Sequence, residues 1–159
     1  DEILFDPIQY VNRNLPSSER SGFVVDSAYT LSNEWSLLVN YHYLQADVSE
    51  GLYRGNEVPF TSEHTGAFTA RFTPAKDLTF SLESLYTGER FKADDDANSA
   101  GKLEAMTLFT LSVAKESGPW SIVARIDNLT DKRYAGYYSV WGQYPQAGRR
   151  YSAGITYQF

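Results

Sequence analysis

The densest group of aromatic side chains in the sequence lies between Tyr134 and Tyr144. Aromatic rings give a large and rigid contact area at a low cost in conformational entropy, and they often dominate sites that bind ligands. The same composition also suits a loop that only packs against its neighbours, so both interpretations stay open. As a hypothesis we take the ligand-binding interpretation, with four residues expected to act as a group: Tyr137, Tyr138, Trp141 and Tyr144.

Other residues that could perform chemistry are scattered. Asp94, Asp95 and Asp96 with Asn98 offer oxygen atoms to a hard cation such as Ca²⁺, but their spacing is not that of an ordered calcium loop, which favours a solvated acidic segment. The two histidines, His42 and His64, are isolated from each other and form no metal-binding or catalytic constellation. No nucleophile with a matching base stands out. We therefore expect no catalytic residues, no metal site, no cofactor and no enzyme activity.

Composition narrows the class of protein. A chain of 159 residues suits one domain, and aromatic residues make up 15% of it. The net charge of −6 argues against a nucleic-acid partner, which requires a basic surface. No apolar run reaches the roughly 20 residues that a transmembrane helix needs. The absence of cysteine agrees with an oxidising compartment.

The last ten residues, 150–159, alternate strictly between two faces and end on an aromatic residue. Tyr151, Ala153, Ile155, Tyr157 and Phe159 share one face, whereas polar or small residues share the other. An outer-membrane barrel needs this pattern, because its outer face meets lipid and its inner face meets water. A strand of a soluble all-β domain is the competing interpretation.

The same alternation repeats along the chain. Short connections at 32–34, 73–77 and 115–119 alternate with long ones at 48–63, 88–102 and 129–148. This predicts an all-β fold, a transmembrane antiparallel β-barrel with an up-and-down meander of about eight strands. The expected strands are 1–5, 19–31, 35–47, 65–72, 78–87, 103–113, 120–127 and 150–159.

Aromatic residues on the apolar face gather near both ends of the expected strands, while aliphatic residues and Phe fill the middle. Amphipathic rings prefer the headgroup boundary, so two such girdles are typical of a membrane barrel. Near the short turns lie Tyr29, Trp35, Phe72, Trp120, Tyr157 and Phe159, and near the long loops lie Tyr41, Tyr43, Tyr86 and Tyr151. Charged residues on the other face would face the lumen, since lipid excludes them: Asp26, Arg71, Glu83, Glu104, Arg125, Asp127 and Arg150.

Two motifs near the C-terminus resemble those of TonB-dependent outer-membrane receptors. Asn128–Tyr134 is similar to their "N-L-x-D-x-x-Y" element, and 148–151 is similar to their "G-R-x-Y" strand entry, which precedes a last strand ending in Phe. Residues 19–23 resemble an "R-x-G-x-E" entry with Val24 in place of Glu. Residues 55–64 resemble a "G-x-x-V-P-x-x-P-x-H" loop end with Ser62 in place of the second Pro.

The resemblance implies a barrel of about 22 strands filled by an N-terminal plug that TonB grips. Residues 1–159 would then be a single barrel segment, and the plug and earlier strands would be absent from this chain. Asp1–Pro7 lack the pattern of a signal peptide and look like a strand end, so we expect a trimmed C-terminal part. The plug would contact the lumen-facing residues Arg71, Glu83, Glu104, Arg125 and Arg150, and Tyr151, Tyr157 and Phe159 would form the membrane-insertion signature.

The implied function is active transport of a scarce nutrient across the outer membrane of a Gram-negative bacterium, energised through TonB, with a ferric siderophore as the expected cargo. The implied partners are the lipid bilayer and lipopolysaccharide, TonB through the missing plug region, a small metal-chelate ligand and the barrel-assembly machinery, with no nucleic acid. A second hypothesis from the residues is a small, self-contained eight-stranded outer-membrane protein with a structural or adhesin-like role.

Overall fold

The computed structural model describes residues 3–6, 11–14, 17–139 and 141–159, and all regular elements in these ranges are β-strands. The described residues include no helix long and apolar enough to cross a membrane. The strands are β1 (Ile3–Asp6), β2 (Val11–Asn14), β3 (Ser18–Thr30), β4 (Trp35–Val48), β5 (His64–Ala75), β6 (Leu78–Thr87), β7 (Arg90–Phe91), β8 (Lys102–Leu103), β9 (Met106–Ser117), β10 (Trp120–Asp127), β11 (Ala135–Ser139), β12 (Gly142–Pro145) and β13 (Arg150–Tyr157).

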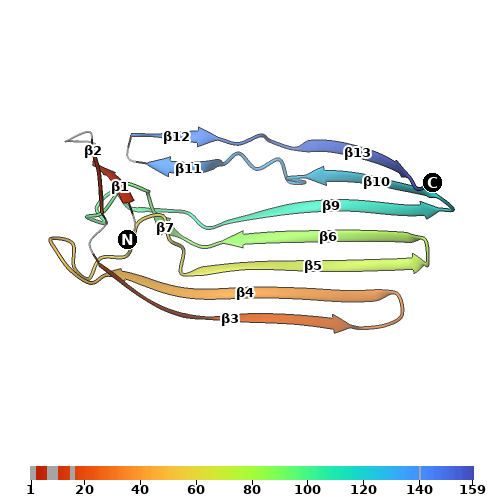
Figure 1. The fold of residues 1–159 in the computed structure, drawn as a ribbon, viewed down its shortest axis with the longest axis horizontal. Coiled ribbons are helices and arrows are strands. Elements are labelled where there is room, and N and C mark those ends of the chain that lie inside the picture. The colour runs from red at the N-terminus through yellow and green to blue at the C-terminus, as the bar shows by residue number, and fades with distance from the viewer. Residues whose placement is uncertain (1–2, 7–10, 15–16, 140) are drawn as a thin grey trace.

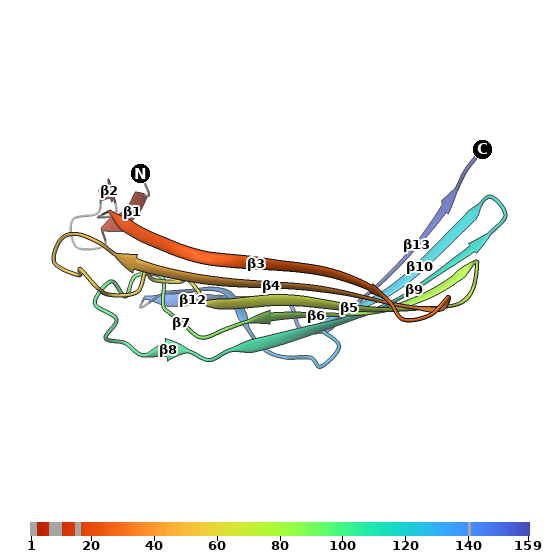
Figure 2. The same ribbon diagram turned by 90° about the horizontal axis from the view of Figure 1, so that it is seen from below.

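Seven long strands form one antiparallel sheet in the order β13-β10-β9-β6-β5-β4-β3 (Figure 1). Apart from the small strand pairs in the connections, each strand lies next to the one before it, which confirms the predicted meander. The short turns and the C-terminus lie at one end of the sheet, and the long connections lie at the other (Figure 1). The sheet bends along its length, with β3 and β13 at its two edges (Figure 2).

The strand count and one strand start differ from the sequence prediction. Residues 3–6 do not join the main sheet, because β1 pairs with β2, so the sheet has seven strands rather than eight. β9 begins at Met106, and Leu103 belongs instead to the two-residue strand β8, which pairs with β7. The connections predicted as loops at 88–102 and 129–148 therefore contain short hairpins of their own, a pairing that period-two alternation does not reveal.

The register of the sheet separates the two faces as alternation predicts. Leu82 pairs across strands with Ala70 and Leu111, whereas its neighbour Glu83 pairs with Thr69 and Thr110 on the opposite face. At the short-turn end of the apolar face, rings pair across strands. Trp35 stacks on Phe72 at 4.6 Å between ring centroids, and Trp120 lies 4.7 Å from Tyr157. At the long-loop end, Phe23 contacts Tyr41 and Tyr43 at 6.0 and 5.6 Å.

The long connections are joined to one another by hydrogen bonds. A small buried cluster of Ala46, Val48 and Val58 holds the 48–63 connection against the end of β4. The same connection is bonded to the 88–105 connection, where the Glu57 backbone N–H donates to Asn98 Oδ1 at 2.8 Å. The Ala93 N–H in turn donates to the carbonyl of Tyr138 in β11 at 2.8 Å. The three long connections are thus hydrogen-bonded to one another at the long-loop end of the sheet.

Candidate ligand site and polar face

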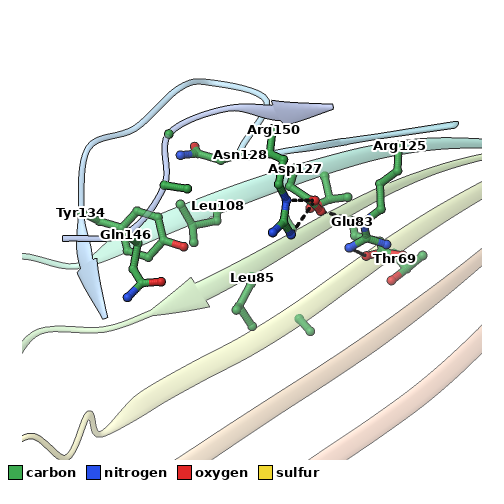
Figure 3. A pocket seen from close by; sticks show the side chains of 15 residues that line it. Thr69, Glu83, Leu85, Leu108, Arg125, Asp127, Asn128, Tyr134, Gln146 and Arg150 are labelled. Carbon is green, nitrogen blue, oxygen red and sulfur yellow. Dashed lines mark hydrogen bonds and ion pairs between the residues drawn. The ribbon is translucent and has the colours of Figure 1, made fainter. Parts of the chain in front are cut away.

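An ion-pair network occupies the polar face near the long-loop end of β6, β10 and β13. Asp127 accepts hydrogen bonds from two arginines: Arg125 Nε donates to its Oδ1 at 2.6 Å, and Arg150 donates to its Oδ2 through Nε at 3.2 Å and Nη2 at 3.0 Å (Figure 3). Arg125 Nη2 also lies 3.5 Å from Glu83 Oε2. The positive charges of the two arginines therefore equal the negative charges of Asp127 and Glu83 within the network. Arg150 stays largely exposed and contacts only Asp127 among the carboxylates of the network.

The network lines an open cavity of about 430 Å³ on this face (Figure 3). Three of the five residues predicted to face the lumen and plug, Glu83, Arg125 and Arg150, come together here. Arg71 lies exposed on the same face, in the cross-strand row that joins Arg71, Ser81, Ser112 and Arg125, but outside the cavity lining. Glu104 is exposed in the connection between β8 and β9, outside the sheet, so its predicted place within a long strand is wrong.

The segment that follows β10 forms a tight turn held by side chains. Asn128 is 6% exposed and has a left-handed backbone with φ of 50°. Its side chain closes the turn in both directions, since Oδ1 accepts from the Lys132 N–H at 2.9 Å and Nδ2 donates to the Lys132 carbonyl at 2.8 Å. Asparagine is the residue, after glycine, that best tolerates this backbone region while bonding locally.

Asp131 ties this turn to the entry of β13. It also has a left-handed backbone, with φ of 54°, and its Oδ1 accepts from the Arg149 N–H at 2.7 Å. A Cβ at Gly148 would lie 2.6 Å from the same oxygen, so only glycine leaves room for this contact. The two motifs, 128–134 and 148–151, therefore contact each other through Asp131, Gly148 and Arg149. This contact, together with the Asn128 turn, is called the clasp below, and it fixes β13 beside β10.

We expect Asn128→Ala to destabilise this clasp. Alanine pays about 1–2 kcal/mol for the left-handed backbone, and loss of the two side-chain hydrogen bonds to the Lys132 backbone costs about 0.5–1.5 kcal/mol each. Asn128→Gly removes the same bonds without the backbone penalty, so it should be less destabilising. The measurement is the temperature at which the folded barrel loses its compact gel mobility. Equal transition temperatures for the two variants would show that the left-handed backbone carries no penalty here.

The aromatic residues of 134–144 form a hairpin, β11 paired with β12, at the long-loop end. Three rings are exposed on it: Tyr137 at 38%, Tyr144 at 69% and Trp141 at 73%. Tyr137 and Tyr144 pair across the hairpin with ring centroids 5.9 Å apart. Tyr138 differs from them, because it is half-buried and its hydroxyl accepts the Ala135 N–H at 2.9 Å. Tyr138 thus stabilises the hairpin, and the other three rings present a surface.

Sequence reasoning missed two residues that join this surface from other connections. The ring of Phe60 lies 5.3 Å from that of Tyr137, and the guanidinium of Arg90 lies 4.9 Å above the Phe60 ring. Burial lowers the pKa of Arg90, which is 6% exposed. Burial also raises the pKa of Tyr137, and so does the carboxylate of Asp94, to which its hydroxyl donates. No local pattern marks either missed residue, since they meet the hairpin only through folding.

The acidic segment around Asp94, Asp95 and Asp96 forms a turn. Asp95 is buried, and its carboxylate accepts from the Ser99 N–H at 2.9 Å and the Ala100 N–H at 2.9 Å. No group of three or more acidic, histidine or cysteine side chains within metal-binding reach occurs in the described part of the chain. His64 accepts or donates one hydrogen bond with the hydroxyl of Tyr41, at 2.7 Å from its Nδ1, on the apolar face.

Comparison with known proteins identifies the family. The family model described as TonB dependent receptor-like, beta-barrel matches residues 1–129. The chain belongs to the TonB-dependent receptor β-barrel family. Among curated proteins, no sequence matches it. The family places it in the outer membrane of Gram-negative bacteria, with the long connections facing outside as in other outer-membrane barrels.

Solved structures of receptors share this fold. The ferric yersiniabactin uptake receptor FyuA from Yersinia pestis is 19% identical and covers 91% of this chain with a TM-score of 0.77. The ferric enterobactin receptor PfeA from Pseudomonas aeruginosa is 21% identical over 92% with a TM-score of 0.74. The ferric citrate transporter FecA is 24% identical over 87% with a TM-score of 0.72. The chain spans 24%, 23% and 24% of these proteins.

The predicted insertion residues lie on β13, an edge strand of the sheet that this chain forms, and directly after it. Tyr151 and Tyr157 are exposed on the apolar face of β13. Phe159 follows the strand as a fully exposed ring, 5.0 Å from that of Tyr157 in an edge-to-face arrangement. Because Tyr157 also contacts Trp120, the three rings form a short ladder at the short-turn end.

Proposed function

We propose that this chain is the C-terminal part of the barrel wall of a receptor that imports a scarce nutrient through TonB, with a ferric siderophore as the cargo. The proposal rests on one observation: a chain of this barrel family carries exposed aromatic rings on one of its long connections. Tyr137, Trp141 and Tyr144 stand exposed at the long-loop end. Structurally similar proteins that are named as a ferric yersiniabactin uptake receptor, a ferric citrate transporter and a ferric enterobactin receptor support the choice of cargo.

The exposed rings suit capture of a small chelate before its passage through the barrel. An exposed apolar cluster commonly marks a binding surface. The hydrogen bonds between the long connections hold the backbone of the hairpin in place, so little backbone entropy is lost on binding. Tyr137, Tyr138, Trp141 and Tyr144 are the proposed ligand residues, with Tyr138 acting through the hairpin conformation.

A plug in the part of the receptor outside this chain is the proposed partner of the polar face. The five residues proposed to face it are Arg71, Glu83, Glu104, Arg125 and Arg150. Arg150 has the strongest case, because it is largely exposed beside the cavity and bonds to one oxygen of Asp127. A carboxylate of the plug could take the remaining donors of such a guanidinium. TonB would act through that plug.

The alternative of a small, self-contained eight-stranded barrel is not favoured. In the described part of the chain, β1 pairs with β2 rather than with β3, and β3 and β13 remain the two edges of the sheet. Open edges within hydrocarbon leave backbone groups without partners, which supports the proposal that neighbouring strands come from elsewhere in the receptor.

Uptake of radioactive iron by cells that produce the complete receptor, in a strain lacking its own ferric receptors, tests the proposal. We expect uptake from one or more of three chelates, namely ferric yersiniabactin, ferric enterobactin and ferric citrate, and we expect deletion of tonB to abolish it. The control is the same strain with the empty vector. Uptake that persists without TonB would contradict the mechanism, and no uptake from any of the three chelates would contradict the cargo.

A further inference from the structure

The apolar face of the sheet carries a hollow of about 350 Å³ that extends over β9, β10 and β13. Its base is Ala124, which pairs across strands with Val113 and Ala153, so two alanines lie side by side in this row of the sheet. The outward side chains that line the hollow are Phe80, Leu111, Val113, Ala124, Ile126 and Tyr151. Apart from the hydroxyl of Tyr151, none of these side chains has a polar atom, so the hollow suits hydrocarbon.

A cation lies at the long-loop end of this hollow. Tyr151 lines that end, and its hydroxyl interacts with the guanidinium of Arg149 and raises the pKa of Arg149. Because Tyr151 is on the apolar face, this contact places the Arg149 side chain on the same face, whereas Arg150 bonds to Asp127 on the polar face. The two neighbouring arginines thus serve opposite faces of the sheet.

The guanidinium of Arg149 forms no ion pair within the part of the chain that the structure describes. Its residue is exposed. Asp131 attracts it at longer range, but Asp131 Oδ1 accepts from the backbone N–H of Arg149 at 2.7 Å. The guanidinium therefore keeps donors for an anion, and its planar fork matches the oxygens of a phosphate.

The position of the hollow in the membrane sets the kind of anion. A barrel of this family turns its apolar face to lipid, and a tyrosine at the long-loop end lies at the outer headgroup boundary. From Arg149 to the row of Ala124 and Ala153 the strand rises roughly 13 Å, which is within the roughly 15 Å depth of one hydrocarbon leaflet. An anion that carries a hydrocarbon chain fits this spacing, since the anion reaches Arg149 while the chain lies in the hollow.

We infer that the hollow and Arg149 together form a binding site for lipopolysaccharide, the phosphate-bearing lipid of the outer leaflet, with a phosphate on Arg149 and an acyl chain over Ala124. The inference goes beyond the proposed function, because neither the cargo nor the plug enters it. A basic group beside an apolar surface is a recurrent way to hold a lipid headgroup. Phospholipids of the inner leaflet do not reach the site, because Arg149 lies at the outer end of the strand.

The first test isolates the phosphate contact. The complete receptor, purified in detergent and freed of lipid, is titrated with lipid A and with enzymatically dephosphorylated lipid A in buffer containing EDTA, and binding is followed by native mass spectrometry. Arg149→Gln should weaken binding of lipid A roughly fivefold to tenfold, as for loss of one cation at an anionic headgroup. It should leave binding of the dephosphorylated lipid unchanged, and Arg149→Lys should retain most of the affinity for lipid A.

The matched control is Lys132→Gln, which removes an exposed cation from the adjoining turn and should have little effect. An equal loss for both lipids in Arg149→Gln would show that Arg149 only supports the local structure. An effect of Lys132→Gln as large as that of Arg149→Gln would show a general attraction to positive charge, and displacement of lipid A by inorganic phosphate would show a site for a free anion. Each of these three results would overturn the inference.

The second test fills the hollow. Ala124→Leu puts a larger side chain at its base and should weaken binding of both lipids by at least roughly threefold, because the acyl chain loses apolar contact area. Ala70→Leu makes the same change on the apolar face of β5, outside the hollow, and should have no effect. Equal binding by these two variants, each shown to be folded by its heat-modifiable gel mobility, would contradict an acyl chain in the hollow. Iron uptake is not a readout of either test, so failure of the proposed cargo leaves their results unchanged.

Discussion

Replacing Tyr137, Trp141 and Tyr144 together by alanine is expected to lower the affinity of the complete receptor for its ferric chelate by roughly a hundredfold or more. Truncating a binding anchor typically costs more than about 1 kcal/mol, and three such losses at one surface span several factors of ten. The rings are exposed on a hairpin outside the sheet, so barrel assembly should be unaffected. The measurement is equilibrium binding of ferric enterobactin, ferric yersiniabactin and ferric citrate to purified receptor.

The matched control is Tyr138→Phe on the same hairpin. It removes only the hydroxyl that accepts the Ala135 N–H, so it should weaken the hairpin slightly and binding much less than the triple change. Heat-modifiable gel mobility should be the same for both proteins. An unchanged affinity in the triple variant would show that these rings pack without touching cargo, and the proposed site would then be wrong.

Deleting Phe159 is expected to reduce insertion of the receptor into the outer membrane severely. The ring of Phe159 completes the ladder that Trp120 and Tyr157 begin at the short-turn end, and rings of this type anchor barrels at the headgroup boundary. It is also the end that the barrel-assembly machinery is proposed to recognise. The measurement is the fraction of receptor that is membrane-inserted and heat-modifiable, compared with the fraction that accumulates in the periplasm.

Two controls test whether the ring itself matters. Phe159→Trp keeps an interfacial aromatic group and should restore most insertion, whereas Gln158→Ala changes the neighbouring residue and should have little effect. Wild-type insertion of the deletion variant would rule out Phe159 as part of the insertion signature. Poor insertion of Phe159→Trp would instead point to recognition of the phenyl ring alone.

Much of the fold follows from the sequence by itself. A strand places successive side chains on opposite faces, so alternation alone separates Leu82 from Glu83 and sorts the girdle rings onto the apolar face. The alternation of short and long connections sets the meander and the end at which the C-terminus lies. Local chemistry also marks the turn at Asn128, because few residues tolerate its backbone conformation.

The tertiary structure decided what depends on contacts between distant segments. The sequence pattern suits a partial strand of the meander at residues 1–5 and a long strand from Leu103, but pairing partners assign residues 3–6 to β1 and Leu103 to β8, outside the main sheet. The same reason explains the candidate site. Phe60, Arg90 and Tyr137 lie on three separate connections, and only hydrogen bonds between those connections bring the rings and the guanidinium together. Periodicity reports which face a residue occupies, and it carries no information on which loops meet.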